Sequence, residues 1–136
     1  MRLRELLKFD EIVVQCHDNP DADAIGSGYA LYCYLMDHGK KVSLIYGGNG
    51  RIRKSNLMLM IQMLQIPIKY CDSMEAPELL VTVDCRYGEG NVTHFPARNI
   101  AVIDHHRVNG ALPELSEVRS NLGSCSTLLW EMLKRE

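Results

Sequence analysis

The chain has 136 residues, of which 46% are hydrophobic and 24% charged, and its formal net charge is −2. These values are typical of one globular domain that buries its own core, and they do not indicate a strongly basic nucleic-acid-binding surface. The apolar runs stay well short of the roughly 20 residues that a membrane-spanning helix needs, so no membrane association is expected.

The N-terminal segment and the cysteines indicate the cellular compartment. Residues 1–10 are charged and lack the apolar core of a secretory signal. The five cysteines are widely spaced, and no two of them form a Cys-x-x-Cys pair. They are expected to be reduced thiols that pack as small hydrophobic side chains. Together these features predict a cytoplasmic protein.

Strands and helices are expected to alternate along the chain. Short apolar runs predict six strands, and apolar residues at helical spacing predict three helices. The strands are expected at residues 12–16, 42–46, 66–70, 79–83, 100–103 and 117–119. The helices are expected from residue 23 to a stop at residue 39, at residues 56–64, and from residue 124 onward.

Local signals refine these elements. Asp23 is expected to cap the first helix, and Gly39 to follow its last turn. Gly26 and Gly28 lie near that helix start, where close backbone approach explains them better than flexibility. Pro67 predicts that the third strand lies at an edge of the sheet. The alternation predicts an α/β fold with three layers, in which a mostly parallel sheet carries helices on both faces.

Polar side chains follow three of the expected strands, at the point where each strand ends. These residues are His17, Asp21 and Asp23 after the first strand, Asp84 after the fourth, and Asp104, His105 and His106 after the fifth. Because the carboxyl ends of parallel strands share one edge of a sheet, these side chains should converge. Taken singly, each has an ordinary explanation as a loop residue or a helix cap. Their joint occurrence at three strand ends favours a common site.

The composition of this cluster predicts a metal site. Four carboxylates brought together without a cation would repel one another, and two divalent ions remove that conflict. Carboxylates with imidazoles suit Mn²⁺, Mg²⁺, Fe²⁺ or Zn²⁺. The majority of oxygen donors favours Mn²⁺ or Mg²⁺, and the imidazoles favour Mn²⁺ of these two. Two Mn²⁺ ions are therefore expected, with Mg²⁺ as the alternative.

Three segments resemble the motifs of the DHH phosphoesterase superfamily, in the same order and each at a strand end. The run from His17 to Ser27 resembles the first motif, although Ala22 stands where many members have glycine. Asp84 resembles the second motif, and residues 104–106 resemble the Asp-His-His run that names the family. The family includes manganese-dependent pyrophosphatases, single-strand-specific exonucleases, oligoribonucleases and cyclic-dinucleotide phosphodiesterases.

The resemblance implies a role for each metal ligand. His17 and Asp21 would hold one ion. Asp23 and His105 would hold the second ion. Asp84 would bridge the two ions.

The resemblance also implies roles around the substrate. His106 would contact the phosphate as a hydrogen-bond donor or general acid, and Asp104 would orient a histidine from behind. Asn19 would lie beside the substrate or the bridging water. Ser126 lies in a helix opening whose hydroxyl groups could bind an anion or form a plain helix cap.

The implied activity is hydrolysis of phosphodiester or phosphoanhydride bonds in short oligonucleotides or nucleotides by metal-activated water. The oligoribonuclease and nucleotide-phosphatase branch fits best. The family also carries a fourth metal-binding aspartate and a C-terminal substrate-binding domain, which residues 1–136 do not contain. The chain is therefore expected to be an N-terminal catalytic domain that is weak or inactive by itself. The alternative is a non-catalytic module that binds a metal and a nucleotide, or a partner; the metal cluster argues against a purely structural module.

Two surface features concern partners. The basic run within residues 51–54 could contact phosphates or form a solvated helix entrance. Leu129, Trp130 and Leu133 on the last helix are expected to form an exposed apolar patch. Such a patch predicts self-association, for example as a homodimer.

Overall fold

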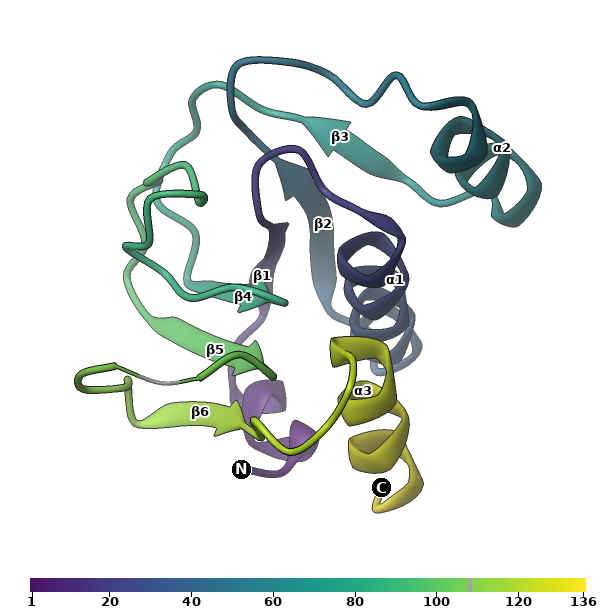
Figure 1. Ribbon diagram of the computed structural model, residues 1–136. Coiled ribbons are helices and arrows are strands. Elements are labelled where there is room, and N and C mark those ends of the chain that lie inside the picture. The colour runs from purple at the N-terminus through teal and green to yellow at the C-terminus, as the bar shows by residue number, and fades with distance from the viewer. Residues whose placement is uncertain (108) are drawn as a thin grey trace.

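The computed structural model describes residues 1–107 and 109–136, and Figure 1 shows how their elements are arranged. The described residues form a six-stranded sheet of order β3-β2-β1-β4-β5-β6. Every neighbouring pair of strands is parallel. The strands are β1 (Glu11–Cys16), β2 (Lys41–Tyr46), β3 (Ile68–Tyr70), β4 (Leu79–Val83), β5 (Ile100–Asp104) and β6 (Leu115–Val118). The predicted α/β fold with a parallel sheet is confirmed.

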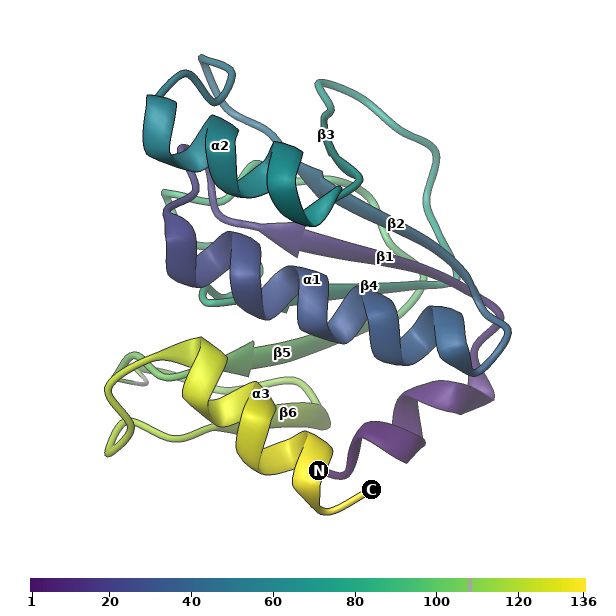
Figure 2. The ribbon, with the colours of Figure 1, turned by 90° about the vertical axis from the view of Figure 1, so that its right-hand side faces the viewer.

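The sheet is the middle of three layers. The helices are η1 (Leu3–Lys8), α1 (Ala22–Asp37), α2 (Ser55–Leu64) and α3 (Cys125–Lys134). Figure 2 shows α1, α2 and α3 on one face of the sheet. On the opposite face, Tyr87 and Phe95 from the connection between β4 and β5 pack near Val13 and Leu80. In the described part of the chain, this third layer is built from irregular chain rather than from a helix, so the expectation of helices on both faces holds for one face only.

Both faces of the central strands are buried, and alternate residues of β1 show it. Ile12, Val14 and Cys16 belong to the main core cluster under the helices. Val13 belongs to the smaller cluster on the opposite face. Gln15 is also buried, and its side-chain Nε2 donates to the carbonyl oxygen of Thr93 at 2.8 Å. A strand buried on both faces has no regular polar alternation, which explains why Ile12, Val13, Val14 and Cys16 are all apolar.

The N-cap of helix α1 lies two residues earlier than the sequence predicted. Asp21, with extended backbone, is the N-cap, and its side chain accepts a hydrogen bond from the backbone N–H of Ala24 at 2.9 Å. The prediction that Asp23 is the cap is wrong, because Asp23 lies inside the first turn. Gly28 confirms the expected close approach, since a β-carbon there would lie 2.9 Å from Cδ1 of Leu44.

Two further expectations concern the edges of the fold. The strand that follows Pro67, β3, lies at an edge of the sheet as predicted. The expected apolar patch on α3 needs correction, because Leu129 is fully buried in the core and Leu133 is partly buried against it. Trp130 remains exposed. The inner face of an amphipathic helix is therefore already covered by α1 and the sheet.

Within residues 1–107 and 109–136, the helices are too short or too polar to cross a lipid bilayer.

Candidate metal centre

The loops that follow β1, β4 and β5 meet at one edge of the sheet. These three strands are neighbours. Cys16 and Val83, the last residues of β1 and β4, lie opposite each other, and Val83 lies opposite Ile103, the residue before the end of β5. The residues directly after the strands are therefore placed side by side.

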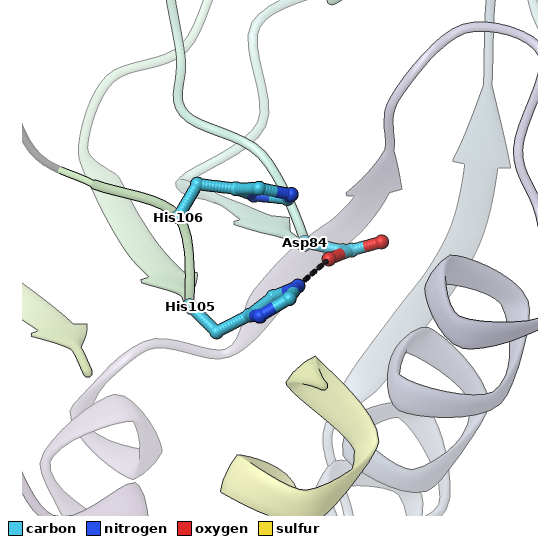
Figure 3. Close-up of side chains that lie close together, drawn as sticks. All are labelled: Asp84, His105 and His106. Carbon is cyan, nitrogen blue, oxygen red and sulfur yellow. Dashed lines mark ion pairs between the residues drawn. The ribbon is translucent and has the colours of Figure 1, made fainter. Parts of the chain in front are cut away.

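Asp84 occupies the middle of this edge, between two histidines. Its carboxylate Oδ2 lies 3.6 Å from Nε2 of His17, and its Oδ1 lies 3.0 Å from Nε2 of His105. Figure 3 shows Asp84 between the loops, with His105 and His106 reaching toward it. Asp84 is 3% exposed, and its Oδ1 accepts no hydrogen bond from the described residues. A buried carboxylate oxygen without a donor is costly unless a cation lies beside it.

The backbone at Asp84 is adapted to this position. Its φ is +61°, in the left-handed region that few residues other than glycine adopt. Aspartate and asparagine tolerate this conformation best, and non-glycine residues held there cluster at functional sites. The turn lets the carboxylate leave the strand direction and point into the edge of the sheet.

Both histidines present the same ring nitrogen to Asp84. Nδ1 of His17 lies 2.8 Å from the carbonyl oxygen of Asp18, and Nδ1 of His105 lies 3.2 Å from that of Leu122. A carbonyl oxygen only accepts, so Nδ1 carries the hydrogen in both rings. In the neutral rings, each Nε2 then directs a lone pair at a carboxylate. This arrangement is unfavourable unless a cation lies between the nitrogen and the carboxylate. Metal-binding histidines are oriented in the same way, because the ring N–H that faces away from the metal donates to a carbonyl or carboxylate oxygen.

A proton can supply that positive charge when no metal is bound. A hydrogen bond to Asp84 is the main cause that raises the pKa of His17 to about 9. Burial of the ring acts in the opposite direction. The edge of the sheet therefore favours a positive charge, which a proton and a metal ion would compete to provide.

The metal-binding groups fall into two sets that share Asp84. Among the described residues, one set is His17, Asp21 and Asp84, and the other is Asp84, His105 and His106. Within each set, one ligand atom per residue lies within 4.8 Å of the others. Imidazole nitrogens with carboxylate oxygens form a donor set that suits a divalent transition ion. The residues therefore fit the predicted pair of ions.

Asp23 lies beside His105 but is held by helix α3. Its Oδ2 is 3.7 Å from Nε2 of His105, and its two oxygens accept hydrogen bonds from the backbone N–H groups of Cys125 (2.9 Å) and Ser126 (2.8 Å). Burial opposes ionisation of Asp23, but these hydrogen bonds outweigh it and lower the pKa of the carboxyl group. Asp23 therefore remains charged and ties the start of α3 to the site.

Asp104 lies behind the two histidines. Its Oδ1 accepts the backbone N–H of His105 at 2.8 Å and lies 2.7 Å from Nδ1 of His106. Asp104 is 1% exposed, whereas the side chain of His106 is 58% exposed. The contact with Asp104 thus holds Nδ1 of His106, while more than half of the His106 side chain is exposed to solvent.

The remaining predicted site residues are placed differently. Asn19 is exposed and has a φ of +51°. Ser126 uses its hydroxyl group to donate to the carbonyl oxygen of Asp23 at 3.3 Å, so its observed role is to hold Asp23. Cys16 and Cys85 are buried beside the ligands, and burial raises the pKa of both thiols, which disfavours the thiolate that a metal would need.

Sequence reasoning missed the role of Asp18. Its Oδ1 accepts hydrogen bonds from the backbone N–H (3.1 Å) and the hydroxyl group (2.8 Å) of Thr93. The backbone N–H of Asp18 donates to the carbonyl oxygen of Asn91 at 2.8 Å. Asp18 therefore holds the connection between β4 and β5 against the loop that follows β1 and carries His17. No local pattern links residues 75 positions apart.

Known proteins resemble the chain over most of its length. Residues 11–136 match the DHH family, N-terminal domain. An uncharacterized protein of Methanocaldococcus jannaschii is 26% identical over 124 residues, which cover 90% of this chain and 25% of that protein. The crystal structure of an exopolyphosphatase-related protein from Bacteroides fragilis has a TM-score of 0.64 at 22% identity, over 98% of this chain and 43% of that one. The chain thus spans less than half the length of either protein.

Proposed function

The chain belongs to the DHH family, and from this premise we propose that it is a metal-dependent phosphoesterase-type hydrolase. The proposed reaction is hydrolysis of a phosphodiester or phosphoanhydride bond in a short oligonucleotide or nucleotide. Two Mn²⁺ ions are the proposed cofactor, with Mg²⁺ as the alternative.

The observation that supports this proposal best is the position of Asp84. Its buried carboxylate has one oxygen directed toward each of two histidines, and both rings are held by backbone carbonyl groups from behind. A single carboxylate with a separate partner on each side is what a bridging ligand requires. A surface ion pair would not need the left-handed backbone that Asp84 adopts.

The proposed division of labour combines these contacts with the roles that the resemblance to the family motifs implies. His17, Asp21 and Asp84 would hold one ion, while Asp84, Asp23 and His105 would hold the other. When bound, such a pair would lower the pKa of a metal-bound water to about 7 and neutralise charge on the phosphate oxygens.

His106 would act on the substrate rather than on the ions. Its exposed ring would donate a hydrogen bond to a phosphate oxygen, or a proton to the leaving oxygen. The buried Asp104 would keep the hydrogen on Nδ1 and orient the ring, through the contact of 2.7 Å.

One observation favours a second candidate, a binding module without turnover. The side chains of Asp21 and His106 are 65% and 58% exposed, so the site is open to solvent in this chain. Catalytic sites usually exclude water and position the substrate, and positioning can contribute roughly 7–11 kcal/mol to lowering the barrier. An open site would bind a metal and a nucleotide but hydrolyse the nucleotide slowly.

A hydrolysis assay with and without metal tests the proposed function. With Mn²⁺ the chain is expected to hydrolyse an activated phosphodiester, bis(4-nitrophenyl) phosphate, at a low but measurable rate. Removal of the metal should abolish this activity, and returning Mn²⁺ should restore it. Manganese binding without turnover of this compound, of dinucleotides, of nucleotide phosphates or of pyrophosphate would contradict the proposal and favour the binding module.

A further inference from the structure

A basic hollow lies beside the proposed metal centre and takes no part in it. We define the basic hollow by Asn19, Asn49, Arg51, Arg53, Lys54 and Asn91, and it encloses about 570 Å³. It lies at the same edge of the sheet as the metal centre, because residues 47–54 follow β2 and β2 is the neighbour of β1.

The positive charges of the basic hollow are not neutralised by ion pairs with nearby carboxylates among the described residues. Arg51, Arg53 and Lys54 form no ion pair with a carboxylate in the part of the chain that the structure describes. Asp18 also lines the hollow, but its carboxylate is engaged by Thr93. Three cations around one engaged carboxylate leave a net positive site, which is what an anion requires.

The walls of the basic hollow are fastened to the sheet. The hydroxyl group of Tyr70 donates to the carbonyl oxygen of Gly48 at 2.6 Å, and the backbone N–H of Ile52 donates to the hydroxyl oxygen of Tyr46 at 3.0 Å. Arg51 lies over the ring of Tyr70, 4.7 Å from its centroid. The loop is therefore held before a ligand arrives, which lowers the entropy cost of binding.

The tight packing around Asp18 also shapes the basic hollow. A β-carbon at Gly48 would lie 2.8 Å from Cβ of Asp18, and one at Gly47 would lie 2.6 Å from the hydroxyl oxygen of Thr93. The backbone after β2 thus lies directly against the loop that carries His17. A ligand held by His17 and its neighbours would reach the basic hollow across Asn19, two positions farther along the chain.

We propose that the basic hollow binds a second phosphate group of the substrate, next to the phosphate at the metal centre. This inference rests on the proposed function, because it assumes that the first phosphate is held there. It assigns substrates with at least two phosphate groups to the chain, such as a 5′-phosphorylated oligonucleotide or a linear polyphosphate. The side-chain amides of Asn19, Asn49 and Asn91 would supply neutral hydrogen bonds alongside the cations.

The test compares ligands that differ by one phosphate. Diadenylate with a 5′-phosphate carries two phosphates, and diadenylate without it carries one. The variant Arg53→Gln/Lys54→Gln should raise KM about tenfold for the phosphorylated compound, with kcat unchanged, and leave KM for the other compound unaltered. Both residues are exposed, so the fold should tolerate the change.

Two further variants serve as controls. Arg53→Lys/Lys54→Arg keeps both charges and should retain most of the affinity. Lys41→Gln removes an exposed cation at the start of β2, at the end of the strands away from the metal centre, and should leave both KM values unchanged. Tripolyphosphate and pyrophosphate, measured in parallel, show whether the second phosphate of a polyphosphate or that of an oligonucleotide is preferred.

A binding measurement separates this inference from the proposed function. In metal-free protein, the terminal phosphate signal of 5′-phosphorylated diadenylate in a phosphorus NMR titration should shift, and the Gln/Gln variant should lose the shift. This result would support the basic hollow even if the chain hydrolyses nothing. Hydrolysis with the same KM in wild type and variant would overturn it and leave the proposed function standing. An equal loss for one-phosphate and two-phosphate ligands would also overturn it.

Discussion

Replacing Asp84 with asparagine is expected to remove most of the stabilisation that Mn²⁺ gives the folded chain. Free Mn²⁺ at a hundred times its Kd should stabilise the wild type by about 2.7 kcal/mol, or roughly 10 °C in Tm for a chain of this size. Asparagine tolerates the left-handed backbone of Asp84, so the fold itself should survive. It cannot offer a charged oxygen to each ion, so Mn²⁺ affinity should fall at least about a hundredfold. Thermal unfolding with and without Mn²⁺ measures the effect.

Asp18→Asn is the matched control for this experiment. Asp18 is next to His17 in the sequence but is not a proposed metal ligand, and its Oδ1 is occupied by hydrogen bonds from Thr93. An asparagine side-chain oxygen can accept the same two hydrogen bonds. The Mn²⁺-dependent rise in Tm should therefore be nearly intact in Asp18→Asn. Equal behaviour of the two variants would refute Asp84 as the shared ligand.

The second large effect is expected from replacing the two adjacent histidines one at a time. The two variants should differ in Mn²⁺ affinity although both lose hydrolysis rate. His105→Ala should lower both Mn²⁺ affinity and the hydrolysis rate, because Nε2 of His105 lies 3.0 Å from Asp84. His106→Ala should lower the rate by about 10²–10⁴-fold while Mn²⁺ affinity stays the same. Calorimetric titration with Mn²⁺ and steady-state kinetics on the same samples measure the two properties.

The position of His106 makes this comparison informative. His106 forms a metal-binding set with Asp84 and His105, so the geometry also allows it to act as a ligand. If His106→Ala weakens Mn²⁺ binding as much as His105→Ala does, its assignment as a phosphate donor is wrong. His38→Ala, at the end of α1, controls for the loss of an imidazole elsewhere.

The sheet and the place of the site were largely predictable because they follow from short apolar runs. The run at residues 79–83 matches β4 residue for residue, since a strand buried on both faces is apolar at nearly every position, with Thr82 as its polar exception. Parallel order then puts the following residue, Asp84, at the same edge as His17 and His105. The clustering of these residues could therefore be predicted from the strand order, without knowing any side-chain conformation.

Interactions between distant residues could not be predicted in the same way. Nothing near Asp23 indicates that the start of α3, more than a hundred positions later, donates two hydrogen bonds to it. Asp21 and Asp23 both suit a helix cap by composition, and the choice depends on how the loop enters the helix. The pairing of Asp18 with Thr93 likewise depends on how the connection between β4 and β5 folds back across the sheet.

The paired metal site is tested most directly by a crystal structure of the chain grown with Mn²⁺, with anomalous scattering used to locate the ions. Two peaks about 3.5–4 Å apart are expected, one on each side of the Asp84 carboxylate. The first should be bound by His17 and Asp21, and the second by His105. A single ion, or two ions that do not share Asp84, would contradict the account.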